Sequence, residues 1–101
     1  MVLCTCGNEE EARRLAHALV EARVAACVSL AGGVSSVYRW KAAVESASEW
    51  LLIIKSSRAM FEKLRAEIEK LHSYEVPEVL ALSVVDGAEG YLNWLEAELG
   101  A

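Results

Sequence analysis

Residues 50–55, Trp-Leu-Leu-Ile-Ile-Lys, are the stretch of sequence that most narrows the choice of fold. Isoleucine and tryptophan are enriched in strands, so their density here favours a strand. A run that is apolar without alternation indicates a strand buried on both faces, as in the middle of a covered sheet. We therefore expect residues 50–54 to form a central strand in which Ile53 is a core residue.

The N-terminal end of the chain predicts a strand followed by a helix. Residues 2–6 have the composition of a short strand. Asn8 then offers an N-cap, and Glu11 stands three residues later, which is the spacing of a capping box. Apolar residues at helical spacing continue from there and predict a helix over residues 9–23.

The segment before the apolar run is expected to be the other half of a hairpin. Residues 25–40 are interpreted as one long strand, with a bend or bulge at Gly32-Gly33. Residues 41–48 are then the turn region, although no Asn-Gly pair marks a tight turn there.

Downstream of the apolar run, two more helices and a last strand are expected. Ser56 or Ser57 can cap the first of these helices, and Pro77 marks a break before a strand over residues 78–85. The apolar stripes of the two helices are Phe61, Leu64, Ile68 and Leu71, and then Tyr91, Leu92, Leu95 and Leu99.

The order strand-helix-strand, strand-helix-strand, helix is typical of an α+β, ferredoxin-like fold, β-α-β-β-α-β-α, with an antiparallel sheet and helices on one face. We expect residues 1–101 to form a single domain. The second face of such a sheet and at least one edge need cover, which other chains can supply.

Composition and charge argue against several classes of function. The net charge is −5 and the basic residues are spread singly, so we expect no binding to nucleic acid. The apolar runs are too short for a bilayer, and the residues after Met1 lack the features of a signal peptide. An odd number of cysteines, three, argues against a disulfide framework. We therefore expect a cytoplasmic protein that does not enter a membrane.

Three segments are distinctive when they are taken together. Residues 19–28 read LVEARVAACV, residues 34–40 read VSSVYRW, and residues 72–79 read HSYEVPEV. In this order they resemble the CutA divalent-cation tolerance family, which carries LVEERLAACV, VxSxYxW and HPYEVPEI. Residues 52–55 and 91–95 fit as well, so that the resemblance covers nearly the whole chain.

The resemblance implies a ferredoxin-like protomer in a tight homotrimer, related in architecture to the PII signalling proteins. It also implies tolerance of copper and other divalent cations, with a first-strand cysteine and a histidine pair as metal ligands in some members. Cys4 and His72 match two of these positions, and Leu71 replaces the other histidine. Ser73 replaces a usual proline, and Ala42 replaces a usual glycine, at a cost of about 1 kcal/mol if that position needs a positive φ.

The candidate metal ligands also have a purely structural interpretation. Cys4 and Cys6 offer soft sulfur, and His72 offers imidazole, which together suit copper or zinc. We expect copper or another divalent cation to bind weakly at Cys4 and His72, since two protein ligands are too few for a closed site. Alternatively, the cysteines are small buried hydrophobes and His72 caps a helix. We expect Cys4 and Cys6 to lie on opposite faces of their strand.

A second set of residues is expected at clefts between subunits. It combines amphipathic aromatic side chains with two charged groups, namely Tyr38, Trp40, Tyr74, Trp94, Lys55 and Glu75. Packing at the interface is the simpler role for the aromatic residues. The alternative function is a PII-like trimeric signalling scaffold that binds a small ligand or a partner at these clefts. The sequence has no Gly-rich phosphate loop, HExxH or nucleophile elbow, and we do not expect an enzyme.

Overall fold

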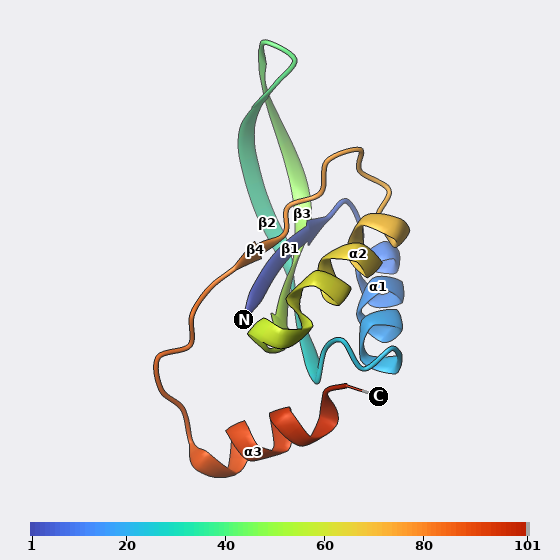
Figure 1. The fold of residues 1–101 in the computed structure, drawn as a ribbon. Coiled ribbons are helices and arrows are strands. Elements are labelled where there is room, and N and C mark those ends of the chain that lie inside the picture. The colour runs from blue at the N-terminus through green and yellow to red at the C-terminus, as the bar shows by residue number, and fades with distance from the viewer. Residues whose placement is uncertain (101) are drawn as a thin grey trace.

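The structure is a computed structural model that describes residues 1–100. Its elements in chain order are β1 (Val2–Cys6), α1 (Glu9–Glu21), β2 (Cys27–Trp40), β3 (Ala43–Lys55), the 3₁₀ turn η1 (Arg58–Met60), α2 (Phe61–Leu71), β4 (Leu80–Ala81) and α3 (Glu89–Glu98). All strand pairs are antiparallel, in the sheet order β2-β3-β1-β4 (Figure 1). The expected α+β, ferredoxin-like fold is confirmed.

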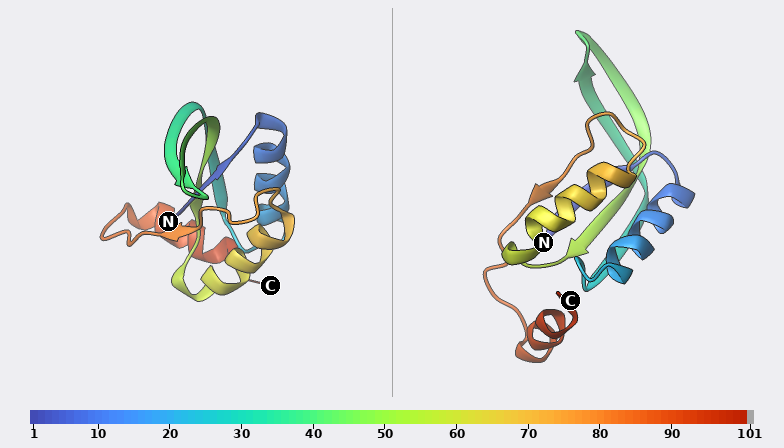
Figure 2. Two further views of the ribbon diagram at one scale, coloured as in Figure 1. Left: turned by 90° about the horizontal axis from the view of Figure 1, so that it is seen from above. Right: turned by 45° about the vertical axis from the view of Figure 1, so that its right-hand side comes forward.

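Helices α1 and α2 lie side by side on one face of the sheet, and α3 lies apart from them (Figure 2). An extended segment leads from β4 to α3. The far end of α3 returns to the chain just after α1, where the Gly100 N–H donates to the Arg23 carbonyl over 3.0 Å. The Arg23 guanidinium also lies 3.6 Å from the Glu98 carboxylate. The same guanidinium donates to the Ala97 carbonyl over 3.5 Å, so the contacts of Arg23 hold the C-terminal end of α3 to the body.

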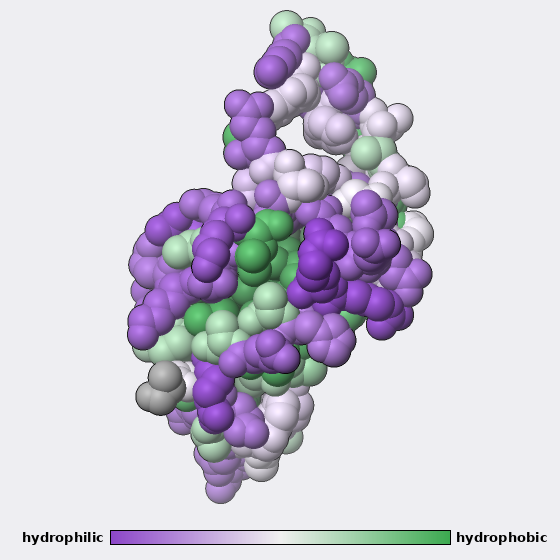
Figure 3. Space-filling view, turned by 90° about the vertical axis from the view of Figure 1, so that its right-hand side faces the viewer, coloured by the Kyte–Doolittle hydropathy of each residue, from purple (hydrophilic) through white to green (hydrophobic). Residues whose placement is uncertain are grey.

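The core lies between the helices and the sheet, and alternate strand residues enter it. Leu52 and Ile54 of β3 are fully buried, and they pair with Cys4 and Val2 of β1. Ile53 faces the other way and is only partly buried, so the expectation that it is a core residue of the protomer is wrong. The reason is the alternation of strand side chains, because helices cover only one face of this sheet. Figure 3 looks onto the helix side and shows an apolar area between mostly hydrophilic surfaces.

The β2–β3 hairpin turns over only two residues, Lys41 and Ala42. The expected turn over residues 41–48 is therefore too long, since residues 43–48 continue the pairing with β2. Both turn residues have positive φ, +49° at Lys41 and +68° at Ala42. This is the pattern of a type I′ turn, whose twist matches the twist of paired strands. The turn was missed because neither residue is the usual asparagine or glycine.

Ala42 should accordingly be a strained position. We expect Ala42→Gly to raise the free energy of unfolding by about 1 kcal/mol, because only glycine adopts positive φ without steric cost. Urea denaturation at one protein concentration measures the change. Ala43→Gly is the matched control, since Ala43 is an ordinary strand residue and its replacement should destabilise. Equal losses in both variants would contradict the assigned turn.

The predicted bulge in the long strand is confirmed. The register of β2 against β3 shifts between Ala31 and Val34. Gly33 has a φ of +74°, and a Cβ on Gly32 would lie 2.7 Å from the Trp50 ring. Both glycines are therefore required, one for its backbone angle and the other for the close approach of Trp50.

The last strand and one helix start differ from expectation. β4 contains only two residues, Leu80 and Ala81, rather than the predicted 78–85. They pair with Leu3 and Val2 of β1, and Met1 and Leu82 exchange one further pair of main-chain bonds. Within residues 1–100, the chain from residue 83 to α3 is not in a strand. Ser57 stands at the N-cap of η1, which leads into α2, but its side chain makes no cap bond. The Ser56 hydroxyl donates to the Val24 carbonyl instead.

No helix within residues 1–100 has the length and apolar character needed to cross a bilayer.

Candidate metal centre

Two thiols of β1 enter the core side by side. Cys4 and Cys6 are separated by one residue, and both are fully buried beneath the helices. The expectation that they lie on opposite faces is wrong, because residues two apart in a strand share a face. They belong to the same layer as Leu52 and Ile54, which the pairing of β1 with β3 aligns.

His72 reaches the same layer from the end of α2. Its N–H donates to the Ile68 carbonyl over 2.8 Å, and its own backbone is extended, with φ −77° and ψ 143°, so the helix ends there. The imidazole turns inward and its side chain is 0% exposed. One nitrogen of the ring and the sulfurs of Cys4 and Cys6 all lie within 4.8 Å of one another. The structure therefore brings together both residues predicted as metal ligands, and adds Cys6.

The hydrogen bonds of His72 fix its tautomer. Nδ1 lies 3.0 Å from the main-chain N of Tyr74, which can only donate, so Nδ1 carries no proton. Nε2 lies 2.7 Å from the Thr5 carbonyl oxygen, which can only accept, so Nε2 carries the proton. The Cys6 sulfur is 3.7 Å from the same Nε2. The ring is thus neutral, and its bond to the Thr5 carbonyl ties the end of α2 to β1. The alternative expectation was that His72 caps the carbonyls of the helix.

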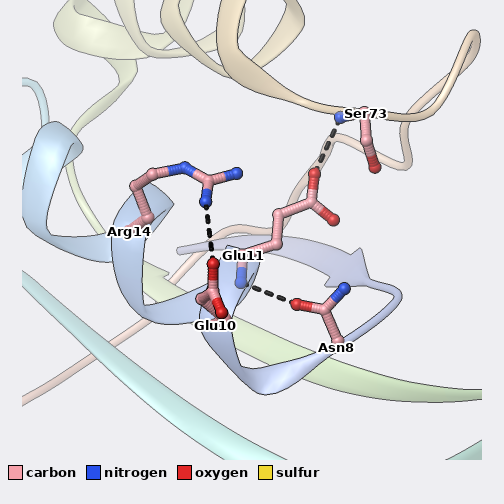
Figure 4. A pocket seen from close by; sticks show the side chains of 5 residues that line it. All are labelled: Asn8, Glu10, Glu11, Arg14 and Ser73. Atoms are coloured by element: carbon pink, nitrogen blue, oxygen red, sulfur yellow. Dashed lines mark hydrogen bonds and ion pairs between the residues drawn. The ribbon is translucent and has the colours of Figure 1, made fainter.

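Glu11 and Ser73 separate this cluster from the surface. The Ser73 N–H donates to Glu11 Oε2 over 2.8 Å, and the same oxygen lies 3.9 Å from His72 Nδ1. A polar pocket of about 360 Å³ opens directly outside this bond, lined by Asn8, Glu10, Glu11, Arg14 and Ser73 (Figure 4). Proline, usual in the family at position 73, has no N–H, so the bond to Glu11 depends on the serine of this chain.

Local electrostatics differ among the buried groups. The shared hydrogen bond with Cys6, followed by burial, raises the pKa of Cys4 well above the ordinary range. The same bond lowers the pKa of Cys6, against the opposing effect of burial. Burial tends to raise the pKa of Glu11, but the hydrogen bonds from Ser73 outweigh it and the pKa is lowered. Glu11 is therefore a carboxylate.

The donor set fits a soft metal ion. Thiolate sulfur and imidazole nitrogen are the ligands of copper(I) and of zinc, and the separation of the three atoms suits coordination of one ion. Leu71, at the position of the family's second histidine, is 40% exposed, whereas the side chain of His72 is buried. The third donor of this chain is thus a cysteine from β1. His72 can bind a metal ion through Nε2 only if this nitrogen loses its proton, because the ion takes the place of that proton.

A second buried polar pair adjoins the cluster. The Tyr74 hydroxyl donates to Glu49 Oε2 over 2.7 Å, and Glu49 is almost fully buried in β3. Burial, followed by this bond to Glu49, raises the pKa of Tyr74. The His72 and Tyr74 rings lie 4.7 Å apart. The loop after α2 is therefore pinned both to β1, through His72, and to the base of the hairpin, through Tyr74.

The residues predicted for subunit clefts lie at separate places in one protomer. Tyr38 and Trp40 are near the hairpin tip, Tyr74 contacts Glu49, and Glu75 is exposed in the following loop. Lys55 and Trp94 stand near the other end, in β3 and α3. The prediction was that these residues meet at clefts between neighbouring subunits. One protomer does not test this, so it stays a prediction.

Sequence reasoning gave too little weight to three residues of this region. Cys6 was recognisable, because alternate residues of a strand face the same way and Cys4 was already a candidate. Glu11 was assigned only to the helix start, where the Asn8 side chain does accept its N–H over 2.8 Å. Glu49 carried no signal, since it lies between the expected turn over residues 41–48 and the apolar run that begins at residue 50.

Comparison with known proteins agrees with this geometry. The family model described as "CutA1 divalent ion tolerance protein" matches residues 1–98. The chain belongs to the CutA1 family. The divalent-cation tolerance protein CutA of Thermus thermophilus is 44% identical over 100 residues, which cover 99% of this chain and 97% of that protein. The chloroplastic CutA of Arabidopsis thaliana is 42% identical over 96 residues, and the match spans 53% of its length.

Solved CutA structures share the whole fold. The Thermus thermophilus Cut A1 structure superposes with a TM-score of 0.96, covering 98% of this chain and 96% of that one, at 44% identity. The CutA of Archaeoglobus fulgidus, described as a periplasmic divalent cation tolerance protein, gives a TM-score of 0.93 at 31% identity, covering 96% of this chain and 94% of its own. The expected CutA membership is confirmed.

Proposed function

We propose that this CutA1 protein serves divalent-cation tolerance as a cytoplasmic homotrimer that binds copper, and that it is not an enzyme. The observation that supports copper binding is the convergence of Cys4, Cys6 and His72 within 4.8 Å in the core. Soft sulfur favours copper(I), while imidazole accepts copper or zinc. The relatives are named as tolerance proteins, which agrees with a binding rather than a catalytic role.

Copper titration of the reduced protein tests this function. We expect the parent to bind and Cys4→Ser to lose affinity, because a hydroxyl is a poor ligand for a soft ion. Equal binding by the two proteins would refute the assignment of the site.

The trimer is supported by apolar surface that the protomer leaves exposed. The hairpin stands clear of the body as an arm (Figure 3). Val37 and Val44 on this arm are 73% and 65% exposed, and Val85 after β4 is 96% exposed. The segment from residue 83 to α3 is also not paired with any strand within residues 1–100. Such surface and edges are typical of subunit interfaces, and closed three-fold symmetry satisfies them in every copy.

Sedimentation equilibrium should therefore give about three times the chain mass of 11.0 kDa. The expected result is a single species over the micromolar range, since the exposed apolar surface makes the monomer unfavourable. A Val85→Asp variant should weaken the assembly, because it places a charge in the proposed interface. A stable monomer of the parent would exclude the trimer.

A second candidate function, a PII-like scaffold with a ligand at subunit clefts, is favoured by Lys55. Its ammonium contacts the Ser29 hydroxyl and lies 3.9 Å from the Cys27 sulfur on the open sheet face. No carboxylate within residues 1–100 forms an ion pair with it. A carboxylate from another subunit or a small anionic ligand would satisfy this charge. Anion binding that survives thiol blocking and is lost in Lys55→Met would support this function.

A further inference from the structure

The His72 ring holds its proton on the wrong nitrogen for a metal ion in the cluster. Nε2, the nitrogen 3.7 Å from the Cys6 sulfur, donates to the Thr5 carbonyl. A metal ion needs the lone pair of that nitrogen, and a neutral ring must then carry its proton on Nδ1. Nδ1 currently accepts from the Tyr74 N–H, and two donors facing each other repel. Metal binding through Nε2 therefore needs a new acceptor beside Nδ1.

We propose that Glu11 is that acceptor, and that it is the positioning residue which switches His72 from the Nε2–H to the Nδ1–H tautomer when a metal ion binds. This rests on the proposed metal-binding function. A carboxylate that accepts the second N–H of a metal-bound imidazole is a recurrent arrangement, which orients the ring and strengthens it as a ligand. Glu11 would act through His72 and would not touch the ion.

The geometry supports Glu11 rather than another carboxylate. Its Oε2 lies 3.9 Å from Nδ1, so a shift of about 1 Å gives a normal hydrogen bond. Its side chain is only 6% exposed, which limits competition from water. Among the described residues, Glu11 is the only carboxylate with an oxygen within 4.0 Å of a His72 ring nitrogen; Glu49, the other buried carboxylate of the region, bonds the Tyr74 hydroxyl instead. Glu10, one residue away, points outward with a side chain that is 91% exposed.

The protons balance in this switch. Cys4 and Cys6 each release one proton to solvent as their sulfurs bind the ion. The imidazole releases the proton on Nε2 and gains one on Nδ1, so that it stays neutral. The net release is two protons per ion bound, and no oxidant or reductant is required.

The switch also moves the loop after α2. When Nδ1 becomes a donor, the Tyr74 N–H loses its acceptor and must turn away from the ring. Tyr74 is bonded through its hydroxyl to Glu49 in β3, at the base of the hairpin arm. Occupancy of the buried site is thereby linked to the position of the Tyr74 ring.

Nitrogen NMR of the imidazole, with copper(I) as a diamagnetic probe, tests the switch directly in the full chain. The free parent should show the proton of His72 on Nε2, and the copper(I)-loaded parent should show it on Nδ1. This reading needs no variant, so a folding defect cannot obscure it. A loaded ring that keeps its proton on Nε2, or that does not bind the ion, would overturn the proposal.

Glu11→Gln and Glu10→Gln form a matched pair for affinity. A glutamine at position 11 can still accept from the Ser73 N–H with its one carbonyl oxygen, which is also the atom that faces Nδ1. It lacks the negative charge that makes the carboxylate the stronger acceptor for an Nδ1–H group. We expect Glu11→Gln to weaken copper(I) binding 10- to 100-fold, as loss of an outer-shell partner typically does. Glu10→Gln removes the same charge and should bind like the parent.

The outcomes separate the two proposals. If the parent binds copper(I) and both variants bind equally well, Glu11 has no positioning role and only this inference fails. If both variants weaken equally, the effect is one of surface charge, and the inference fails again. If the parent itself does not bind copper(I), the proposed function fails and this inference fails with it.

Discussion

Leu52→Ala is expected to lower the free energy of unfolding by about 2–5 kcal/mol, the range for truncating a buried leucine. Leu52 is fully buried in β3, opposite Cys4 of β1 and beneath the two helices. Truncation removes its transfer free energy and leaves a cavity where α1, β1 and β3 meet, a site that cannot collapse without disturbing the sheet. Denaturant unfolding at a fixed protein concentration measures the loss, because the proposed subunit association would also stabilise the fold.

Leu71→Ala is the matched control for this truncation. It removes the same atoms from a leucine that is 40% exposed at the end of α2. Its effect should be clearly smaller, since less apolar surface leaves water there on folding. Equal unfolding midpoints for Leu52→Ala and the parent would show that the sheet–helix layer is not the core.

Removal of the two β1 thiols together should abolish copper binding. In the reduced parent we expect one copper per chain, held by Cys4, Cys6 and His72. Cys4→Ser and His72→Ala should each weaken binding by at least about 100-fold, more than the 10- to 100-fold typical of an outer-shell partner. The double variant Cys4→Ser/Cys6→Ser loses all soft ligands of the cluster and should show no stoichiometric binding. Titration against a competing chelator gives these affinities.

Cys27→Ser is the control for the thiol variants. Cys27 lies outside the cluster, beside Lys55 on the open face, so its replacement should leave the affinity unchanged. Binding in the parent should also weaken as the pH falls, because both thiols must lose their protons to bind the ion. Parent-like affinity in the double variant would show that copper binds elsewhere.

Much of the fold follows from sequence because local signals and the final packing agree. The Asn8 cap, the helical stripes and the paired glycines all appear where their chemistry requires. The sequence predictions are wrong where the outcome depends on tertiary packing. The apolar run at residues 50–55 indicated burial on both faces, but one protomer buries only the face under its helices. Residues 43–48, Ala-Val-Glu-Ser-Ala-Ser, have mostly small or polar side chains on the exposed part of their strand, and they read as a turn for that reason.

The candidate site was only partly predictable for similar reasons. Cys4 and His72 come from the family resemblance, and strand alternation adds Cys6. The tautomer of His72 depends on the Thr5 carbonyl and the Tyr74 N–H, two main-chain groups whose positions no side-chain pattern encodes. In the sequence, Glu11 can be recognised only as a helix-start residue. In the fold, α2 ends beside it, and the Ser73 main-chain N lies 2.8 Å from Glu11 Oε2.

X-ray absorption at the copper edge of the reduced, copper-loaded protein tests the central claim most directly, since it counts the ligands of the ion itself. The structure predicts a shell of two sulfurs, from Cys4 and Cys6, and one imidazole nitrogen, from His72. The sulfur count should fall to one in Cys6→Ser. A shell of nitrogen and oxygen alone, or a sulfur count that Cys6→Ser does not change, would contradict the assignment of this cluster as the metal site.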